Sequence, residues 1–460
     1  MPNISGLYTA LSGMNAQRRV LDVTAHNVAN QATPGYHRQR VELSPVGFDS
    51  VSALHAGQGT QVAGVEIDGV IRVMDQLAEN RLLRETGSQG GTTTLRTHLG
   101  RIEQVFPEPS EDGLAALLDD FWGGWNDLTS RPADTGVRAQ LLERAGALAD
   151  GLQRSAAGIE SAAATAREEI GRLAADVNAI AARVAELNGR IAASPNAVAA
   201  NDLRDQRDLF IRDLAESTGV VARETEAGHL DLYVGGRALV NGSYVHEMDG
   251  SSGVLRWVAD GTDVTAPPSK AAALTQTVGE VVPSYLAMLD DVAARLVADV
   301  NTLHASGYDP SGTSGRDFFD PAGITAATIS LSADVDGQPE RIAAGAPVFP
   351  GPTAPGPLDG EQARAIAALA DSTSGPDTAY RSLVARLGVD VRAAIRRDDV
   401  QSRMTASTEA EAASVGGVSL DEEMANLVAA QRAYEASARV LTTVDELLGV
   451  LIERTGRVGR

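Results

Sequence analysis

Both ends of the chain carry apolar residues spaced alternately three and four apart, which is the pattern of a helix with one buried face. The N-terminal series is Ile4, Leu7, Leu11, Met14, Arg18, Leu21, Ala25 and Val28, in which Arg18 is the charged exception. The C-terminal series is Leu420, Met424, Leu427, Gln431, Tyr434, Ala438, Leu441, Asp445, Leu448 and Ile452, with two polar exceptions. Neither helix can bury such a face alone, so we expect the two ends to pair with each other and with other copies of the chain.

Turn and capping signals set the limits of both terminal helices. The first helix is predicted to end at about Asn30, because Pro34 disfavours a helical Thr33 and Pro-Gly fits the centre of a type II turn. The last helix is predicted to follow a Gly-Gly joint at 416–417. It begins there at a capping box, residues 419–422, and extends to about Arg454.

Helical spacing also dominates the middle of the chain. One bulky apolar face consists of Leu114, Leu117, Leu118, Phe121, Trp122, Trp125 and Leu128. The longest regular series, residues 152–191, predicts a rod of roughly 60 Å. Residues 194–196 interrupt it, and a helix through 203–214 is predicted to fold back as an antiparallel hairpin. A further heptad helix is predicted over 286–303.

Three stretches lack the helical period. Residues 38–75 and 219–268 alternate and contain many glycines, which predicts strands and tight turns. Residues 307–360 are rich in Gly, Pro, Ser and Asp and predict an outlying β or loop module, with a strand-like patch at 327–331.

These patterns together predict a mainly α fold with β modules. The N- and C-terminal helices pair as a coiled coil, a long helical bundle forms the middle domain, and a small β-rich module lies outside it. The predicted divisions are 1–45 with 415–460 as an axial terminal coiled-coil domain, 46–91 as an extended or β linker, 92–218 with 275–306 and 361–414 as a helical rod domain, 219–274 as a β segment, and 307–360 as the outer module.

Composition excludes several classes of function. The formal charge of -22 argues against a nucleic-acid partner. The absence of cysteine excludes disulfides, thiolate metal sites and cysteine catalysis. No apolar run approaches about 18 residues, so we expect no membrane span. The N-terminus lacks the pattern of a cleavable secretory signal, so we expect any export to use another route.

Some patterns resemble catalytic or metal sites and have simpler explanations. Asp202, Asp205 and Asp208 alternate with arginines, which predicts a solvated, ion-paired helix face. The loop 309–317 lacks the last acidic ligand of a calcium site and predicts a polar turn. The histidines are scattered, so we expect no enzyme activity, catalytic residue, cofactor or metal site. Changes at Asp202, Asp205, His229 or His304 are expected to be tolerated.

The terminal segments also resemble a known class of proteins. Ser5-Gly6-Leu7, Ala10-Leu11-Ser12-Gly13-Met14 and residues 27–36 (NVANQATPGY) resemble the N-terminal signature of bacterial flagellar axial proteins. Residues 417–427 and 431–439 resemble the matching C-terminal signature. Within that class, segments 201–208, 233–240 and 301–309 are similar to the hook-associated protein 1 family. The chain departs from the family at 356–360, which lacks an acidic Gly-Asp-Asn cluster, and in its short outer module.

This resemblance implies a structural subunit that joins the flagellar hook to the filament. The family is exported unfolded through the flagellar type III apparatus, without a cleavable signal peptide, to an extracellular position. The implied partners are copies of the chain in a ring or helical assembly, the hook protein, the second hook–filament junction protein and an export chaperone on the C-terminal helix. No nucleic acid or membrane partner is implied.

The residues expected to make these contacts lie in the terminal helices and the turn after the first of them. They are Leu7, Leu11, Met14, Leu21, Val28, Asn30, Thr33, Pro34, Gly35, Tyr36, Leu420, Met424, Leu427, Tyr434, Leu441, Leu448 and Ile452. One alternative is a hook or distal-rod axial protein, which should have a β-rich centre without a long coiled coil. A remote alternative is a muramidase associated with the axial structure, which would need a convergent pair of carboxylates.

Overall fold

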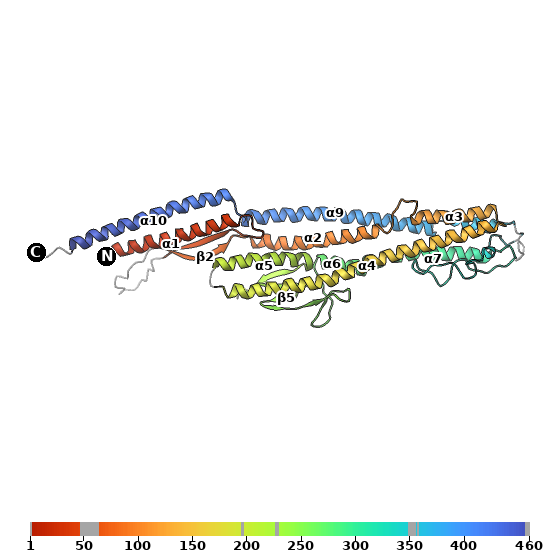
Figure 1. Cartoon of the computed structure of the whole chain (residues 1–460), viewed down its shortest axis with the longest axis horizontal. Coiled ribbons are helices and arrows are strands. Elements are labelled where there is room, and N and C mark those ends of the chain that lie inside the picture. Colours follow the sequence, from red (N-terminus) through yellow and green to blue (C-terminus); the bar gives the residue numbers. More distant parts are fainter. Residues whose placement is uncertain are drawn as a thin grey trace. The chain divides into compact units, whose positions relative to one another are not determined.

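The computed structural model describes residues 2–46, 64–194, 197–225, 230–347, 356 and 358–455. These residues form mainly helices with small antiparallel sheets (Figure 1), which confirms the predicted fold class. They divide into two compact units. The first unit comprises Met1–Gly87, Val177–Glu247 and Arg403–Arg460, and the second comprises Ser88–Asp176 and Met248–Ser402. The finer five-part division remains a prediction, apart from the corrections to 46–91 and to the outer module given below.

In the first unit, the two ends of the chain pair as antiparallel helices, as predicted. Helix α1 (Pro2–Asn30) lies beside α10 (Leu420–Thr455) (Figure 1). Near one end of the pair Gly6 faces Val444, and at the other end the Asn27 side chain bonds to Glu423. Among the described residues, no helix is both long and apolar enough to cross a membrane.

The face of α10 that packs on α1 is offset from the predicted seam. The positions of α10 that are not exposed are Glu423, Leu427, Ala430, Ala433, Tyr434, Ser437, Ala438, Leu441, Val444 and Leu448, a stripe with the alternating spacing of four and three that is wider at Ala433 and Ala438. The predicted seam shares five of these residues but places Met424, Gln431 and Asp445 inside, and all three are exposed. The offset arises because α1 presents small residues, including Gly6 and Gly13, and because Asn27 holds Glu423 inside the pair.

A β-hairpin packs against another face of α1. Strands β1 (Gln39–Val46) and β2 (Gly64–Arg72) are antiparallel with a bulge after Glu42. Val23 of α1 forms a buried cluster with Val41 and Val70 of the hairpin. The Val65 amide donates to Ser12 Oγ at 3.2 Å, which ties the start of β2 to the same helix.

The extended segment predicted for 46–91 is shorter than expected. Helix α2 (Gln76–Glu103) starts at Gln76, so the second part of that range is helical. Asp75 caps it, because its carboxylate accepts hydrogen bonds from the Leu77 and Ala78 amides at 2.8 and 3.3 Å.

The predicted rod and its return helix are present. Helix α4 (Thr135–Ala192) is a single helix, and α5 (Ala197–Thr218) follows it. Arg207 of α5 donates to Asn188 Oδ1 near the end of α4 at 2.9 Å, which supports the predicted hairpin. Within the predicted face, Ile180 is only half-buried and Ala181 is fully buried beside it.

A four-stranded sheet completes the first unit. Its order is β3-β4-β5-β6, all antiparallel: β3 (Val221–Glu224), β4 (Leu230–Val234), β5 (Arg237–Asn241) and β6 (Tyr244–Val245). Strands β4 and β5 are joined by Gly235 and Gly236, both with positive φ, as a two-residue hairpin turn requires. The predicted strands and tight turns are therefore confirmed here.

The second unit is a helical bundle with an aromatic core. Its elements are α3 (Leu114–Ser130), part of α4, β7 (Met248–Asp249), β8 (Arg256–Trp257), α6 (Lys270–Gln276), a π-helix (Thr277–Val281), α7 (Val282–Ser306), α8 (Glu361–Ala367) and part of α9 (Pro376–Gly416). The predicted apolar faces of α3 and α7 meet in one core, where Phe121, Trp125 and Leu296 are fully buried.

Residues 307–347, predicted to belong to an outlying β or loop module, are mostly irregular but do not lie outside the core. Phe318, Phe319, Ile329 and Ile342 are fully buried in the same core as α3 and α7. Within 327–331 only Leu331 pairs, in an isolated bridge to Phe319, so the described patch is not a strand. Asn301 of α7 holds this segment, because its side chain bonds to backbone groups of Phe318 and Phe319. The segment is therefore held by hydrogen bonds from the Asn301 side chain and not by pairing between strands.

His304, predicted to tolerate substitution, is also buried in this core. Its Nδ1 donates to the Arg316 carbonyl at 2.7 Å, and its Nε2 accepts the Ala343 amide at 2.9 Å. Burial lowers its pKa to about 4, so the ring is neutral and structural. His229, named in the same expectation, lies outside the described residues.

Candidate functional site

The turn after α1 has the predicted type II geometry. The Tyr36 amide donates to the Thr33 carbonyl at 3.2 Å, and Gly35 has a φ of 72°. A Cβ at Gly35 would lie 2.6 Å from Leu209 Cδ2, so glycine also allows α5 to pack closely against the turn. Thr33 Oγ1 donates to Asn30 Oδ1 at 3.2 Å, which links the turn to the end of the helix.

Asn27 connects this turn to the C-terminal helix. Its Oδ1 accepts from the Tyr36 hydroxyl at 2.7 Å and from the Gln39 amide at 2.9 Å. Its Nδ2 donates to the Gln39 carbonyl at 2.9 Å and to Glu423 Oε2 at 3.0 Å. The amide oxygen and the amide nitrogen of Asn27 thus both have hydrogen-bond partners, and the side chain is almost completely buried. Asn27 therefore ties α1, β1 and α10 together.

Arg38 makes a second connection to α10. Its guanidinium pairs with Glu422 at 2.8 Å and Glu423 at 2.9 Å. Its amide donates to the Gly416 carbonyl, and its carbonyl accepts from Val73, both at 2.8 Å. The Glu422 carboxylate thus pairs with Arg38, whereas the predicted capping box would have turned it back toward Ser419.

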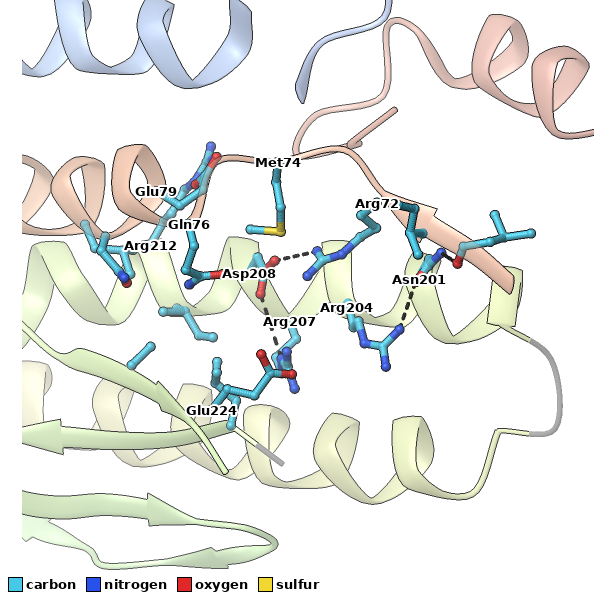
Figure 2. Close-up of a pocket in the computed structure, with 17 residues that line it drawn as sticks. Arg72, Met74, Gln76, Glu79, Asn201, Arg204, Arg207, Asp208, Arg212 and Glu224 are labelled. Carbon is cyan, nitrogen blue, oxygen red and sulfur yellow. Dashed lines mark hydrogen bonds and ion pairs between the residues drawn. The ribbon is translucent and has the colours of Figure 1, made fainter. Parts of the chain in front are cut away.

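A buried ionic cluster lies behind these contacts. His37 Nδ1 is 2.8 Å from Asp205 Oδ1, and its Nε2 is 3.4 Å from Glu79. Arg72 bridges Asp205 at 2.9 Å and Asp208 at 2.6 Å, and Figure 2 shows the Arg72–Asp208 pair. We call His37, Arg72, Glu79, Asp205 and Asp208 the ionic hub.

Contacts within the hub favour the charged forms of His37 and Glu79. Burial alone would lower the pKa of His37, but hydrogen bonds to Asp205 and Glu79 outweigh burial and raise it to about 9. Burial likewise opposes ionisation of Glu79, yet the His37 hydrogen bond and the Arg212 charge lower its pKa. The pKa of Tyr36 is raised, first by burial and then by the negative charges of Asp202, Asp205 and Glu423.

The expectation of a solvated face on α5 is therefore wrong for Asp205 and Asp208. The Asp205 side chain is only 8% exposed, and it pairs with His37 and Arg72. Asp202 is partly exposed and bonds to His26 and Gln39. Most partners of the three carboxylates come from the segment after the turn, and His26 comes from α1 before it. The spacing of the three aspartates by three residues, together with His37 and Arg72 as cations without an assigned partner, was the only sign of this cluster in the sequence.

His37, Asp205 and Asp208 could in principle offer ligands to a metal, since their ligand atoms lie within 4.8 Å of one another. The Arg72 guanidinium, however, contacts both carboxylates. It supplies the positive charge that a metal would bring, and the geometry is that of an ion-pair network.

The structure places the predicted assembly residues in three settings. Leu11, Thr33, Pro34, Leu420 and Met424 are exposed. Leu7, Met14, Leu21, Val28, Asn30, Gly35, Tyr36, Leu427, Tyr434, Leu441 and Leu448 are half-buried. The side chain of Ile452 lies outside the described residues. The structure brings the half-buried residues of α10 onto the α1 seam, and it leaves the exposed residues available to other chains.

Exposed apolar residues remain on α10 after it pairs with α1. Leu420, Met424 and Val428 are spaced by four and share one side of the helix, which we call the outer flank. Val440, Leu447 and Val450 are exposed farther along. Val428 and Val450 are not among the predicted assembly residues.

Three family models match the chain in separate regions. "Flagellar hook-associated protein FlgK helical domain" matches residues 99–319. "Flagella basal body rod protein" matches 7–37, and "Flagellar basal body rod FlgEFG protein C-terminal" matches 413–454. The flagellar hook-associated protein 1 of Bacillus subtilis (strain 168) is 26% identical over 99% of both chains. The chain belongs to the FlgK family of flagellar hook-associated proteins.

Other FlgK-family comparisons agree. The flagellar hook-associated protein 1 of Salmonella typhimurium is 25% identical over 67% of this chain and 58% of that protein. The structure of the flagellar hook junction protein FlgK from Burkholderia pseudomallei matches with a TM-score of 0.63 and 14% identity, over 72% of this chain and 99% of that one. The rod-type family models match the terminal helices and the few residues beside them, whereas the FlgK helical domain includes all of α4, α5 and α7.

Proposed function

We propose that this chain is a structural subunit of the bacterial flagellum that joins the hook to the filament. Membership of the FlgK family and the names of its relatives support this role. The observation that carries it is the antiparallel pair of terminal helices, tied by Asn27 and Arg38, with apolar residues left exposed on α10. Such a pair is a preformed unit that can pack against identical pairs.

The exposed apolar residues supply the energy for assembly. Burying one large apolar side chain contributes about 1.5 to 3 kcal/mol, so a few residues on each subunit stabilise a lateral contact appreciably. The outer flank of α10 offers three of them without disturbing the seam with α1. In this proposal the protein acts through assembly and has no catalytic role.

The proposed partners follow from the junction role. They are other copies of the chain, the hook protein, the second hook–filament junction protein and a flagellar export chaperone. The chaperone is proposed to bind α10 before export and neighbouring subunits to bind it afterwards. Because the two interactions would use the same surface, they would be mutually exclusive. The proposed final location is the extracellular flagellum.

The test places a charge on the outer flank. Met424 is 51% exposed, so Met424→Asp should leave the free energy of unfolding within about 0.5 kcal/mol of wild type. A charge buried between subunits is costly, so assembly should fail. Motility, secreted protein and flagella seen by electron microscopy would be compared in a strain that lacks the native gene.

The matched control is Asn426→Asp, which adds the same charge at a neighbouring exposed polar position of α10. It should assemble normally. Complete, motile flagella built from Met424→Asp would show that the outer flank is not an assembly surface.

A further inference from the structure

A cavity of about 390 Å³ lies in the first unit, between β2, α2, α5 and the strands β3 and β4 (Figure 2). A volume of this size accommodates a small molecule or an inserted side chain. Its lining includes four arginines, Arg72, Arg204, Arg207 and Arg212, although the chain as a whole is strongly acidic. Four guanidinium groups beside one cavity are unexpected in a chain with a formal charge of -22.

Two of the four arginines have close carboxylate partners, within 3.2 Å. Arg72 contacts Asp208 at 2.6 Å, and Arg212 contacts Glu79 at 3.2 Å. Both pairs lie on the cavity lining, and in each pair the arginine and the carboxylate neutralise each other's charge. They therefore leave no excess positive charge for a ligand.

Arg204 and Arg207 differ, because their close hydrogen-bond partners among the described residues are amides. Arg204 donates to Asn201 Oδ1 at 2.8 Å and is half-buried. Arg207 donates to Asn188 Oδ1 at 2.9 Å and makes a longer ion pair, 3.8 Å from its Nε to Asp208 Oδ1. Both side chains come from successive turns of α5 and line the same cavity.

Arg207 is almost fully buried, and its ion pair with Asp208 is long, at 3.8 Å. Its side chain is 4% exposed, and its Nε has no hydrogen-bond partner among the described residues. Burial of the guanidinium lowers its pKa. Asn188 holds it in place and is itself fixed by bonds to the carbonyls of Leu230 and Gly242. The donor is thus oriented before any ligand arrives.

We propose that this cavity binds a carboxylate, held by the Arg204 and Arg207 guanidinium groups. A planar guanidinium donates two parallel hydrogen bonds to a carboxylate, and both arginines retain unused donors. Glu79, Asp208 and Glu224 also line the cavity, so the excess positive charge is small. This small excess charge matches one carboxylate group of an acid better than a phosphate, which carries more than one negative charge on a single group. The carboxylate comes either from a free small acid or from an acidic side chain of an adjacent copy of the chain.

The first arm of the test measures binding by the full-length monomer. Succinate would be titrated by calorimetry against wild type, Arg204→Gln and Arg183→Gln, with phosphate and chloride at equal ionic strength. Arg183 is an exposed arginine on α4 and is the control for loss of one charge. Wild type and Arg183→Gln should bind succinate saturably and more tightly than phosphate, and Arg204→Gln should bind at least about tenfold more weakly. Unchanged circular dichroism would confirm that Arg204→Gln is folded.

The second arm separates the two sources. If the carboxylate belongs to an adjacent copy, Arg204→Gln should assemble poorly, and saturating succinate should slow assembly of wild type. If it belongs to a free acid, succinate binding is weakened in Arg204→Gln while assembly proceeds normally. The absence of saturable succinate binding together with normal assembly of Arg204→Gln would overturn the proposal, as would equal losses in Arg183→Gln. The binding arm uses the monomer, so its outcome does not depend on the flagellar role.

Discussion

Asp205 is the residue on which most of the ionic hub depends. It contacts both His37 and Arg72, so Asp205→Asn leaves two buried cations without their shared counter-ion. Breaking a buried pair in this way costs about 3 to 5 kcal/mol, and the free energy of unfolding in urea should fall by that amount. Asp213→Asn, at an exposed position of the same helix, is the control and should change stability little. A loss below about 1 kcal/mol in Asp205→Asn would mean that the hub is dispensable.

His37 gives the hub a defined pH dependence. Its pKa is raised from 6.5 to about 9 by Asp205 and Glu79, so the folded state binds its proton more tightly than the unfolded state. The resulting stabilisation is complete below the unfolded pKa, declines as pH rises from about 6.5, and is lost above about 9. We therefore expect the stability difference between wild type and His37→Gln to shrink over this range. Urea unfolding at several pH values would measure it, and a difference that grows with pH would contradict the assignment.

At the scale of elements, the pair of α1 and α10 depends on small residues at the contact. A Cβ at Gly13 would lie 3.4 Å from Ser437 Oγ, so alanine fits and a larger side chain pushes α10 away. Gly13→Leu should therefore destabilise the pair, although leucine is the better helix former by nearly 1 kcal/mol. Hydrogen exchange of the α10 amides, which should become faster, would measure this effect.

Gly449→Leu is the matched control on the same pair, because no atom lies within 4 Å of a Cβ at Gly449. It should leave α10 exchange unchanged or slower. Equal exchange in the two leucine variants would argue against close packing at Gly13.

At the scale of the whole molecule, the helical core of the second unit must stay intact for the proposed junction to carry load. Leu296 is fully buried there, so Leu296→Ala should cost about 2 to 5 kcal/mol of unfolding free energy. In flagella, we expect the weakened junction to release filament subunits into the medium, which a secretion assay would detect. Leu77→Ala, at a position 79% exposed on α2, should have no such effect. Stable flagella with Leu296→Ala would show that core stability does not limit the junction.

Local periodicity was enough to predict most helices and the pairing of the two ends. The faces of α3, α4 and α7 are buried largely where the spacing indicates, and Pro34-Gly35 forms the predicted turn. These features depend on residues a few positions apart, whose preferences act within one turn or one helix. The family resemblance likewise rested on contiguous segments.

Only the tertiary structure decided which side of α10 meets α1 and which charges pair. Two neighbouring stripes of α10 carry apolar residues, so the choice between Met424 and Glu423 for the inner position depended on Asn27 and Arg38, about 400 residues away. Asp205 has arginines beside it in the sequence, yet its partners are His37 and Arg72. A charged group near many possible partners is assigned to one of them only when packing removes water from around it.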